Sequence, residues 1–353
     1  MVNKKGLELH FHWIIVLIAG AVILFFFFSV VQKQRSFSEE RLSIALSRDI
    51  EAVFSSAVES KGTSQVLSIP KGGIAFSCSE VCDCNFWIGD KATQFGDNII
   101  FAPDFLSQGS AIAWSLDWKV PFRAANFLFL QGVFDEYFVV VDSSDSSSLG
   151  FLRELNRSLP SDVILRVISL PEVSEVVPEN NVKYRFIFLN SLVSSPFGLS
   201  GEFADADVSV VFLNSDDRSV TFYEKSERDL RFDADTSLYL GDAGVFAAVF
   251  AEDKDMFECN LKQAFFRLSV VADILDKRAG VLDDQMNKIN RSDCIYSAPG
   301  MNYFRDISSY ARELSLSSSF VDMSGVFDQL AAAVDGVESL NRNLIQQSCP
   351  GIF

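Results

Sequence analysis

Histidine is almost absent from this chain of 353 residues, and that scarcity removes several classes of function. The two histidines, His10 and His12, lie just before an apolar run near the N-terminus, so no imidazole follows residue 35. Ser-His-Asp and Cys-His catalytic systems and His-ligated zinc sites are therefore excluded from most of the chain. Neither a GxxxxGK[ST] phosphate loop nor a GxGxxG dinucleotide turn occurs. Catalysis by carboxylates alone or by a Ser/Lys pair remains open, and the sequence favours a non-enzymatic protein.

Positive charge is also scarce. The chain has 30 Lys and Arg against 47 Asp and Glu, which gives a formal net charge of −17. Such a field repels phosphate backbones, so no nucleic-acid partner is expected. With 48% hydrophobic and 22% charged residues the chain is a folded one, and its length allows two or three compact units.

One uncharged apolar run, Trp13 to Val31, is the strongest local signal. As a helix it spans about 28 Å, which matches the hydrocarbon thickness of a bilayer. A cleaved signal peptide is disfavoured because the run leads into Gln32-Lys33-Gln34-Arg35 and not into a small-residue cleavage site. We therefore expect a single-pass anchor in the cell membrane, with the lipid bilayer as a partner.

The orientation of the anchor does not follow from charge alone, because Lys4 and Lys5 on one side are balanced by Lys33 and Arg35 on the other. The N-terminal tail is short, and six cysteines indicate an oxidising compartment. Two Asn-x-Ser triplets, at Asn156 and Asn290, are compatible with glycosylation. These features predict that the bulk of the chain is extracytoplasmic.

Asn3-Lys4-Lys5-Gly6 before the apolar run resembles the prepilin-type (class III) signal of archaeal surface proteins. The resemblance implies cleavage after Gly6 and packing of the helix into a filament core. The chain departs from that pattern, since Glu8 stands two residues after the glycine where pilins usually carry an acid at the fifth position. The anchor and the cysteine-containing remainder also resemble uncharacterised archaeal membrane-anchored proteins, which implies a cell-surface location.

We expect a mixed fold, α/β (α+β), in five parts. These are a cytoplasmic tail and anchor (1–35), a juxtamembrane amphipathic helix (36–60), a β-rich cysteine-containing module (61–133), an α/β sheet unit (134–250) and a C-terminal helical segment (251–353). Within the second part, Ser36-Phe37-Ser38-Glu39 has the pattern of a capping box and predicts that a new helix starts there. A pilin would instead continue one helix out of the membrane.

Alternating apolar residues predict strands in the third part. Residues 74–88 have the pattern of two short strands around a turn, and residues 112–122 have the clearest period of two in the chain. Short apolar runs at 137–142, 163–168, 184–189 and 208–213, with a helix-like stretch at 149–159, predict a βαβ unit and a largely parallel, covered sheet. Apolar residues at helical spacing over 261–286, 303–314 and 327–344 predict a helical hairpin or small bundle.

The loop after the first strand of the α/β unit contains D-x-S-x-S, formed by Asp142, Ser144 and Ser146. It resembles the metal-dependent adhesion motif of von Willebrand factor A domains, which implies Mg²⁺ or Ca²⁺ on hard oxygen ligands. The alternative is a plain Ser/Asp-rich polar loop. The pairs Asp205/Asp207 and Asp233/Asp235 could bind calcium, but lone D-x-D pairs are usually solvated turns, so both stay unassigned, and no other cofactor is indicated.

The six cysteines favour disulfides over zinc, because C-x3-C-x-C supplies three ligands and no histidine completes a site. Of the 15 pairings that are open, a shared hairpin face favours Cys78–Cys84. Neighbouring helix ends favour Cys294–Cys349, which leaves Cys82–Cys259.

The leading hypothesis is a non-enzymatic, membrane-anchored cell-surface protein of assembly, adhesion or envelope type, with protein partners at the surface and an oligomeric state that the sequence leaves open. The alternatives are a pilin-like subunit processed after Gly6 and a carboxylate-dependent surface hydrolase.

Overall fold

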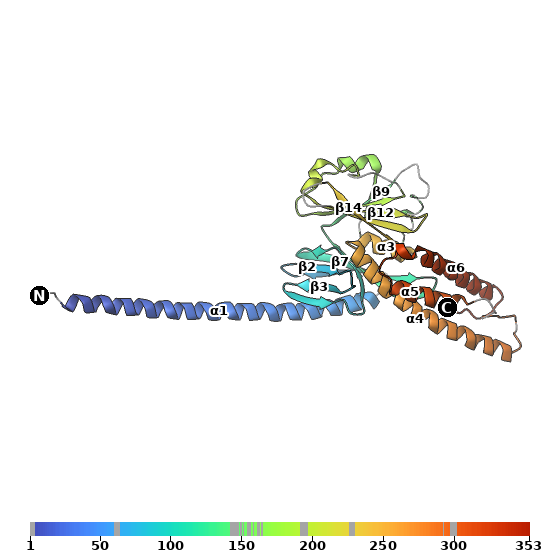
Figure 1. The fold of residues 1–353 in the computed structure, drawn as a ribbon, viewed down its shortest axis with the longest axis horizontal. Coiled ribbons are helices and arrows are strands. Elements are labelled where there is room, and N and C mark those ends of the chain that lie inside the picture. The colour runs from blue at the N-terminus through green and yellow to red at the C-terminus, as the bar shows by residue number, and fades with distance from the viewer. Residues whose placement is uncertain are drawn as a thin grey trace.

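The computed structural model describes residues 4–59, 64–141, 165–190, 197–225, 230–291, 293–296 and 302–353, together with isolated residues between 148 and 163. Figure 1 shows a long rod, helix α1, that enters a folded body composed of β-sheets and a helical segment. The fold is therefore mixed α and β, as expected.

Helix α1 (Lys4–Glu59) is one uninterrupted helix of 56 residues, about 84 Å long at the usual helical rise. The prediction that a capping box at Ser36–Glu39 starts a separate helix is wrong, because the backbone passes through these residues in helical conformation. A capping sequence acts only where the preceding residue leaves the helix, and here the residues on both sides favour helix.

The two ends of α1 have different surroundings. In the body, Phe54 is 1% exposed and packs edge-on against Phe86, with ring centroids 5.6 Å apart. In the rod, apolar side chains between Trp13 and Val30 are exposed, among them Leu17, Leu24 and Phe25 at more than 70%. Within the described residues, no helix has both the length and the apolar character that a membrane crossing requires.

Two four-stranded sheets surround the end of α1. In the first, antiparallel β1 (Ser64–Ile69), β7 (Gly109–Lys119) and β8 (Arg123–Gly132) are joined by β5 (Ile99–Phe101), which runs parallel to β8. The second has the order β4 (Lys91–Gln94), β3 (Cys84–Ile88), β2 (Ile74–Cys78), β6 (Phe105–Leu106). The hairpin expected over 74–88 is confirmed, with Cys78 opposite Cys84.

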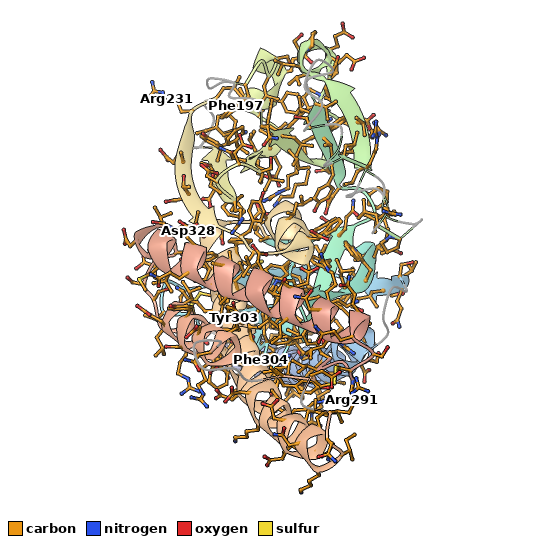
Figure 2. All side chains as sticks on the ribbon, turned by 90° about the vertical axis from the view of Figure 1, so that its right-hand side faces the viewer. Phe197, Arg231, Arg291, Tyr303, Phe304 and Asp328 are labelled. Carbon is orange, nitrogen blue, oxygen red and sulfur yellow. A yellow bond between two sulfur atoms is a disulfide. The ribbon has the colours of Figure 1, made fainter. Side chains whose placement is uncertain are left out.

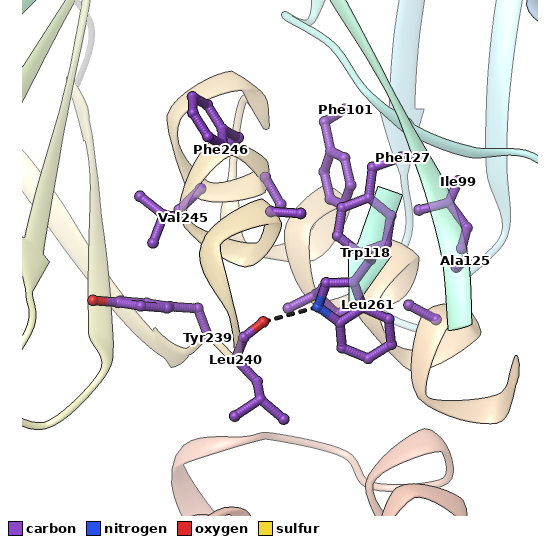
Figure 3. Close-up of a cluster of buried hydrophobic side chains, with 14 of the residues drawn as sticks. Ile99, Phe101, Trp118, Ala125, Phe127, Tyr239, Leu240, Val245, Phe246 and Leu261 are labelled. Atoms are coloured by element: carbon purple, nitrogen blue, oxygen red, sulfur yellow. Dashed lines mark hydrogen bonds between the residues drawn. The ribbon is translucent and has the colours of Figure 1, made fainter. Parts of the chain in front are cut away.

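The strand expected over 112–122 is confirmed as far as Lys119, where β7 ends. A turn with a cis Val120–Pro121 peptide bond then leads into β8. Trp114 and Trp118 are 1% and 0% exposed, so these aromatic side chains belong to the core. Figure 3 shows Trp118 among Phe101, Phe127 and Leu261, with its indole N–H donated to the Leu240 carbonyl at 2.8 Å.

The third sheet has six strands and lies above the other two in Figure 1. Its order is β10 (Leu165–Ser169), β9 (Glu136–Val141), β11 (Lys183–Leu189), β12 (Asp207–Asn214), β13 (Ser219–Lys225), β14 (Phe232–Leu238). The first four strands are parallel, as predicted, whereas β13 and β14 are antiparallel and were not predicted. The helix expected at 149–159 lies mostly outside the described residues.

Both faces of this sheet are covered, which explains its continuous apolar runs. One face, with Val139, Ile187 and Val211, joins the main core, which also contains residues of α3 (Asp242–Phe250). The other face, with Phe138, Phe186 and Val210, forms a second core with the 3-10 helices η1 (Leu170–Glu175) and η2 (Gly201–Ala204).

The C-terminal part is the predicted helical segment. It contains α4 (Lys254–Lys288), α5 (Tyr303–Ser315), a 3-10 turn η3 (Val321–Met323) and α6 (Ser324–Gln346). Figure 2, turned a quarter from Figure 1, shows α6 in front with Tyr303 and Phe304 behind it. The predicted apolar seam of α4 is buried, including Leu261, Phe265 and Leu268. That seam therefore packs within the chain.

The three disulfides are the three that the sequence favoured: Cys78–Cys84, Cys82–Cys259 and Cys294–Cys349. The second joins the β2–β3 hairpin to α4 across a sequence separation of 177 residues. The third joins the region after α4 to the chain end after α6. Three disulfides are consistent with an extracellular protein.

Candidate functional site: two acidic hollows

Two surface hollows each bring several carboxylates together. The first, here named the sheet hollow, has a volume of about 650 Å³ and lies at the amino ends of strands β11 and β12. Its acidic lining residues are Asp104, Asp135, Glu179, Glu202, Asp205 and Asp207. The predicted D-x-S-x-S site follows the carboxyl end of β9, whereas this hollow lies at the amino ends of the parallel strands.

A buried lysine, Lys183, lies among the acids of the sheet hollow. The Lys183 side chain is 11% exposed and forms ion pairs with Asp104 and with Glu252, the latter at 2.8 Å. Burial alone would lower the pKa of Lys183, but Glu252, Asp104 and Asp207 together raise it above its usual value. Lys183 therefore stays charged, and its role is to bind acids from other elements.

Arg185, two residues further along β11, joins the sheet to the end of α3. Its guanidinium donates to the Glu252 carbonyl at 3.2 Å, to the Ala248 carbonyl at 3.4 Å and to the Ala251 carbonyl. These carbonyls belong to the C-terminal end of α3 and the residues just after it, where the helix dipole favours a cation. We name Lys183, Arg185, Glu252 and Asp104 the cationic clasp.

Asp135 differs from the other acids of the sheet hollow. Burial raises its pKa to about 6, while a hydrogen bond from the Gly132 N–H and the charge of Lys183 act in the opposite direction. The Gly132 N–H donates to Oδ2 at 2.8 Å. A Cβ at position 132 would lie 2.7 Å from this carboxylate, so a larger residue there would displace the Asp135 side chain. The pKa of Asp207 is also raised by burial.

The second hollow, named the hairpin hollow, has a volume of about 1200 Å³ and lies between the β2–β3 hairpin and α4. Its acidic lining residues are Glu80, Asp83, Glu224, Asp235, Asp253, Asp255 and Glu258. Burial and mutual repulsion raise the pKa values of Glu224, Asp253 and Asp255. Both hollows therefore present fields that attract cations and repel anions.

Glu258 of the hairpin hollow is structural. Its side chain is buried and accepts hydrogen bonds from the Ser237 hydroxyl at 2.8 Å and the Phe320 N–H at 3.4 Å. Lys262, one helical turn further along α4, lies 3.7 Å from the same carboxylate. Glu258 thus joins β14, α4 and the segment before η3.

The structure indicates no metal within the residues it describes. The group of potential ligands found there is Asp293, Cys294 and Cys349, and both cysteines belong to one disulfide. The predicted ligands Asp142, Ser144 and Ser146 lie outside the described residues, so that site stays a prediction. Of the two D-x-D pairs, Asp205 and Asp207 line the sheet hollow, whereas Asp235 lines the hairpin hollow.

The two glycosylation triplets have different outcomes. Asn156 lies outside the described residues. Asn290 is exposed and has a φ of 58° just after the end of α4, an accessible position for a modifying enzyme. Glycosylation of Asn290 stays a prediction.

Comparisons with protein-family models, with curated proteins and with solved structures find no match. The function proposed below therefore rests on this chain's own sequence and geometry.

Sequence reasoning missed the cationic clasp, although β11 carries a signal for it. Lys183 and Arg185 stand at a period of two in an otherwise apolar strand, Lys-Tyr-Arg-Phe-Ile-Phe-Leu. Two cations on one face of a buried strand require partners on the element that covers that face. Nothing in the local sequence identifies those partners as Glu252 and Asp104.

Proposed function

We propose that this protein is a non-enzymatic cell-surface component, which a helical anchor in the cell membrane holds outside the cytoplasm. The observation that carries this proposal is the contrast along α1. Its apolar residues between Trp13 and Val30 are exposed over many turns, whereas Phe54 at its other end is buried in the body. Exposed apolar surface on this scale needs an apolar environment, and a bilayer supplies one.

The disulfides support the orientation. All six cysteines are paired, and such bonds form and persist in oxidising compartments outside the cytoplasm. The acidic body supports it as well, because a strongly negative surface is not drawn to anionic headgroups. The helix between the apolar run and the body would then act as a stalk.

Membrane flotation and surface proteolysis test this proposal. We expect the full-length protein to float with membrane vesicles in a density gradient and to resist extraction by carbonate at high pH. Protease added to intact cells should remove the C-terminal part. Recovery in the aqueous phase without detergent, or full protection of the C-terminal part in intact cells, would refute the anchored cell-surface function.

The continuity of α1 favours a second candidate, a pilin-like subunit. Such a subunit needs one helix that leaves the membrane without a break and then packs against the body, and α1 has this form. Processing after Gly6 would make Leu7 the first residue of the mature protein. Mass spectrometry of the mature N-terminus decides the matter, since an intact N-terminus in filament-forming cells would contradict it.

The sheet hollow keeps the carboxylate-dependent hydrolase as a third candidate. Such an enzyme needs two acids in one pocket, one of them protonated near neutral pH. Burial brings the pKa of Asp135 to about 6, closer to neutral pH than that of a free carboxyl, and Asp207 lines the same hollow. If Asp135→Asn and Asp207→Asn leave every surface hydrolase activity of the cells unchanged, this candidate falls.

A further inference from the structure

Helix α4 carries a second apolar seam, on the face opposite the one that packs inside the body. Phe266, Val270, Ile274 and Val281 are 55%, 41%, 58% and 55% exposed. They follow one another at steps of four, four and seven residues, so they lie on one stripe along the helix. Leu268, Leu275 and Ala279 of the inner seam are buried. Helix α4 is thus apolar on two faces, and the body covers one of them.

We propose that this outer seam is the contact between two copies of the chain, with their α4 helices packed side by side and parallel. The inference rests on the proposed membrane anchor and names the partner of the anchored protein. It is carried by the spacing of the seam, by the charges beside it and by the direction of α4.

The spacing is that of a parallel two-stranded coiled coil. With Ile274 and Val281 at positions a, Val270 and Lys277 fall at positions d, and the charged residues Arg267 (a) and Asp284 (d) end the apolar part of the seam on either side. β-branched residues at a favour two strands over three or four. Lys277 can cover the seam with its apolar stem while its charge reaches water.

The residues that flank the seam face complementary residues of the second copy when the two helices are parallel. They do not do so when the helices are antiparallel. A residue at position g lies beside the residue five positions later on the partner helix, at position e. Asp273 then meets Arg278 of the second copy, and Phe266 meets Val271. An antiparallel pair would place each flank against the same flank of the partner. The existing contact of Asp273 with Arg312, at 3.3 Å, uses Oδ2, and the carboxylate has a second oxygen for Arg278.

The direction of α4 suits two copies in one membrane. In Figure 1, α4 lies at a slant to α1, but both helices lead away from the side on which the N-terminus lies. A two-fold axis along parallel α4 helices therefore sends both α1 helices toward the same side. An antiparallel pair would send them to opposite sides, which one membrane does not allow.

The size of the seam indicates a weak contact that the membrane strengthens. A few side chains fall short of the roughly 1,000 Å² that a stable interface buries. Confinement of both copies to one bilayer raises their effective concentration. A weak contact can then be occupied although it buries little surface. The seam thus suits an assembly of anchored proteins.

Energy transfer between labelled copies of the full-length chain in lipid vesicles tests the proposal. We expect transfer above the level of random mixing for the natural protein. Val270→Lys with Ile274→Lys should raise the protein-to-lipid ratio needed for half-maximal transfer at least tenfold. Val177→Lys, at a position 66% exposed on another surface, is the matched control and should change nothing.

A charge exchange gives the sharper result. Asp273→Arg and Arg278→Asp should each weaken transfer, and the double variant should restore it, because it recreates the pair in the opposite sense. Circular dichroism and thermal melting confirm that each variant is folded. Transfer at the random level for the natural protein, or transfer unchanged by the lysine substitutions, overturns the proposal. Failure of the protein to float with the vesicles would instead refute the anchor.

Discussion

At the scale of single residues, Asp135 shows how position changes the chemistry of a carboxylate. The residue follows the turn after β8, where its side chain accepts the Gly132 N–H and lies near Lys183. Burial outweighs both favourable contacts and raises its pKa from 3.8 to about 6. An acid whose pKa is higher in the folded state than in the unfolded chain destabilises the fold above that pKa.

The upward shift of the Asp135 pKa determines how the stability of the fold depends on pH. The charged form of Asp135 costs up to about 3 kcal/mol at pH 8, and the cost disappears as the pH falls through 6 toward 4. Asp135→Asn keeps an oxygen that accepts the Gly132 N–H and removes the charge. We expect it to stabilise the protein by about 1–3 kcal/mol at pH 8 and to have little effect at pH 4.5. Thermal unfolding at the two pH values measures the difference.

Asp90→Asn, at an exposed turn, is the control and should behave like the natural protein at both pH values. An equal shift of Asp135→Asn at pH 8 and pH 4.5 would show that the effect is not electrostatic.

At the scale of elements, two of the disulfides close loops of very different length. Cys78–Cys84 closes a hairpin with a sequence separation of 6, whereas Cys82–Cys259 closes a loop with a separation of 177. A cross-link limits the freedom of the unfolded chain more when it closes a longer loop. The long-range bond also joins two elements that no local contact would bring together.

The two bonds therefore predict different losses of stability. Replacing Cys82 and Cys259 by serine should lower the free energy of unfolding by about 5 kcal/mol, and replacing Cys78 and Cys84 should lower it by about 2 kcal/mol. Urea unfolding of the two double variants gives both values, and each pair serves as the control for the other. Equal losses, or the reverse order, would disprove the argument from loop length.

Helix packing gives a second prediction at this scale, from two glycines. A Cβ at Gly336 of α6 would lie 2.5 Å from the Tyr303 ring of α5, whereas a Cβ at Gly280 of α4 meets nothing within 4 Å. Alanine favours the helical state over glycine by about 1 kcal/mol. Gly280→Ala should therefore stabilise the protein by about 0.5–1 kcal/mol.

Gly336→Ala should destabilise it by about 1–2 kcal/mol, because overpacking outweighs the gain in helix propensity. Melting temperatures of the two variants should move in opposite directions. A rise for both would mean that α5 and α6 can separate without cost.

At the scale of the whole molecule, the cationic clasp joins the six-stranded sheet to the rest of the body. Lys183 and Arg185 belong to that sheet, Asp104 follows β5, and Glu252 follows α3. Four strands of the sheet are parallel, so their amino ends meet at one edge, and the clasp and Asp207 lie there. The clasp thus fixes the position of the six-stranded sheet relative to the rest of the body.

Removal of its lysine should loosen this arrangement. Lys183→Met keeps most of the side-chain volume but removes the cation that pairs with Asp104 and lies closest to Glu252, which should cost about 3–5 kcal/mol of unfolding free energy. Lys71→Met, at an exposed position, is the control and should cost less than about 0.5 kcal/mol. Urea unfolding measures both, and a loss below about 1 kcal/mol at Lys183 would show that the clasp adds no stability.

The sequence by itself determined much of this protein. Period-two patterns gave the β2–β3 hairpin and β7, continuous apolar runs gave the parallel strands β9 to β12, and helical spacing gave α4, α5 and α6. Two cysteine pairs followed from a shared hairpin face and from neighbouring helix ends, and the third pair was the one that remained. These features depend on neighbours along the chain, whose geometry is fixed by the repeat of a strand or a helix.

Only the tertiary structure decided the rest. Strand β14 was missed because its polar residues alternate without a strong apolar face, as in Asp233-Ala-Asp235, and this edge strand is held by its neighbour's hydrogen bonds. Strand β13 was missed because its buried face holds only Val220 and Phe222, which is a short pattern. The cap at Ser36 was inactive because the helix on both sides continued. The acids of the two hollows and the partners of Lys183 come from distant segments, and local patterns carry no information on contacts that depend on how separate elements pack.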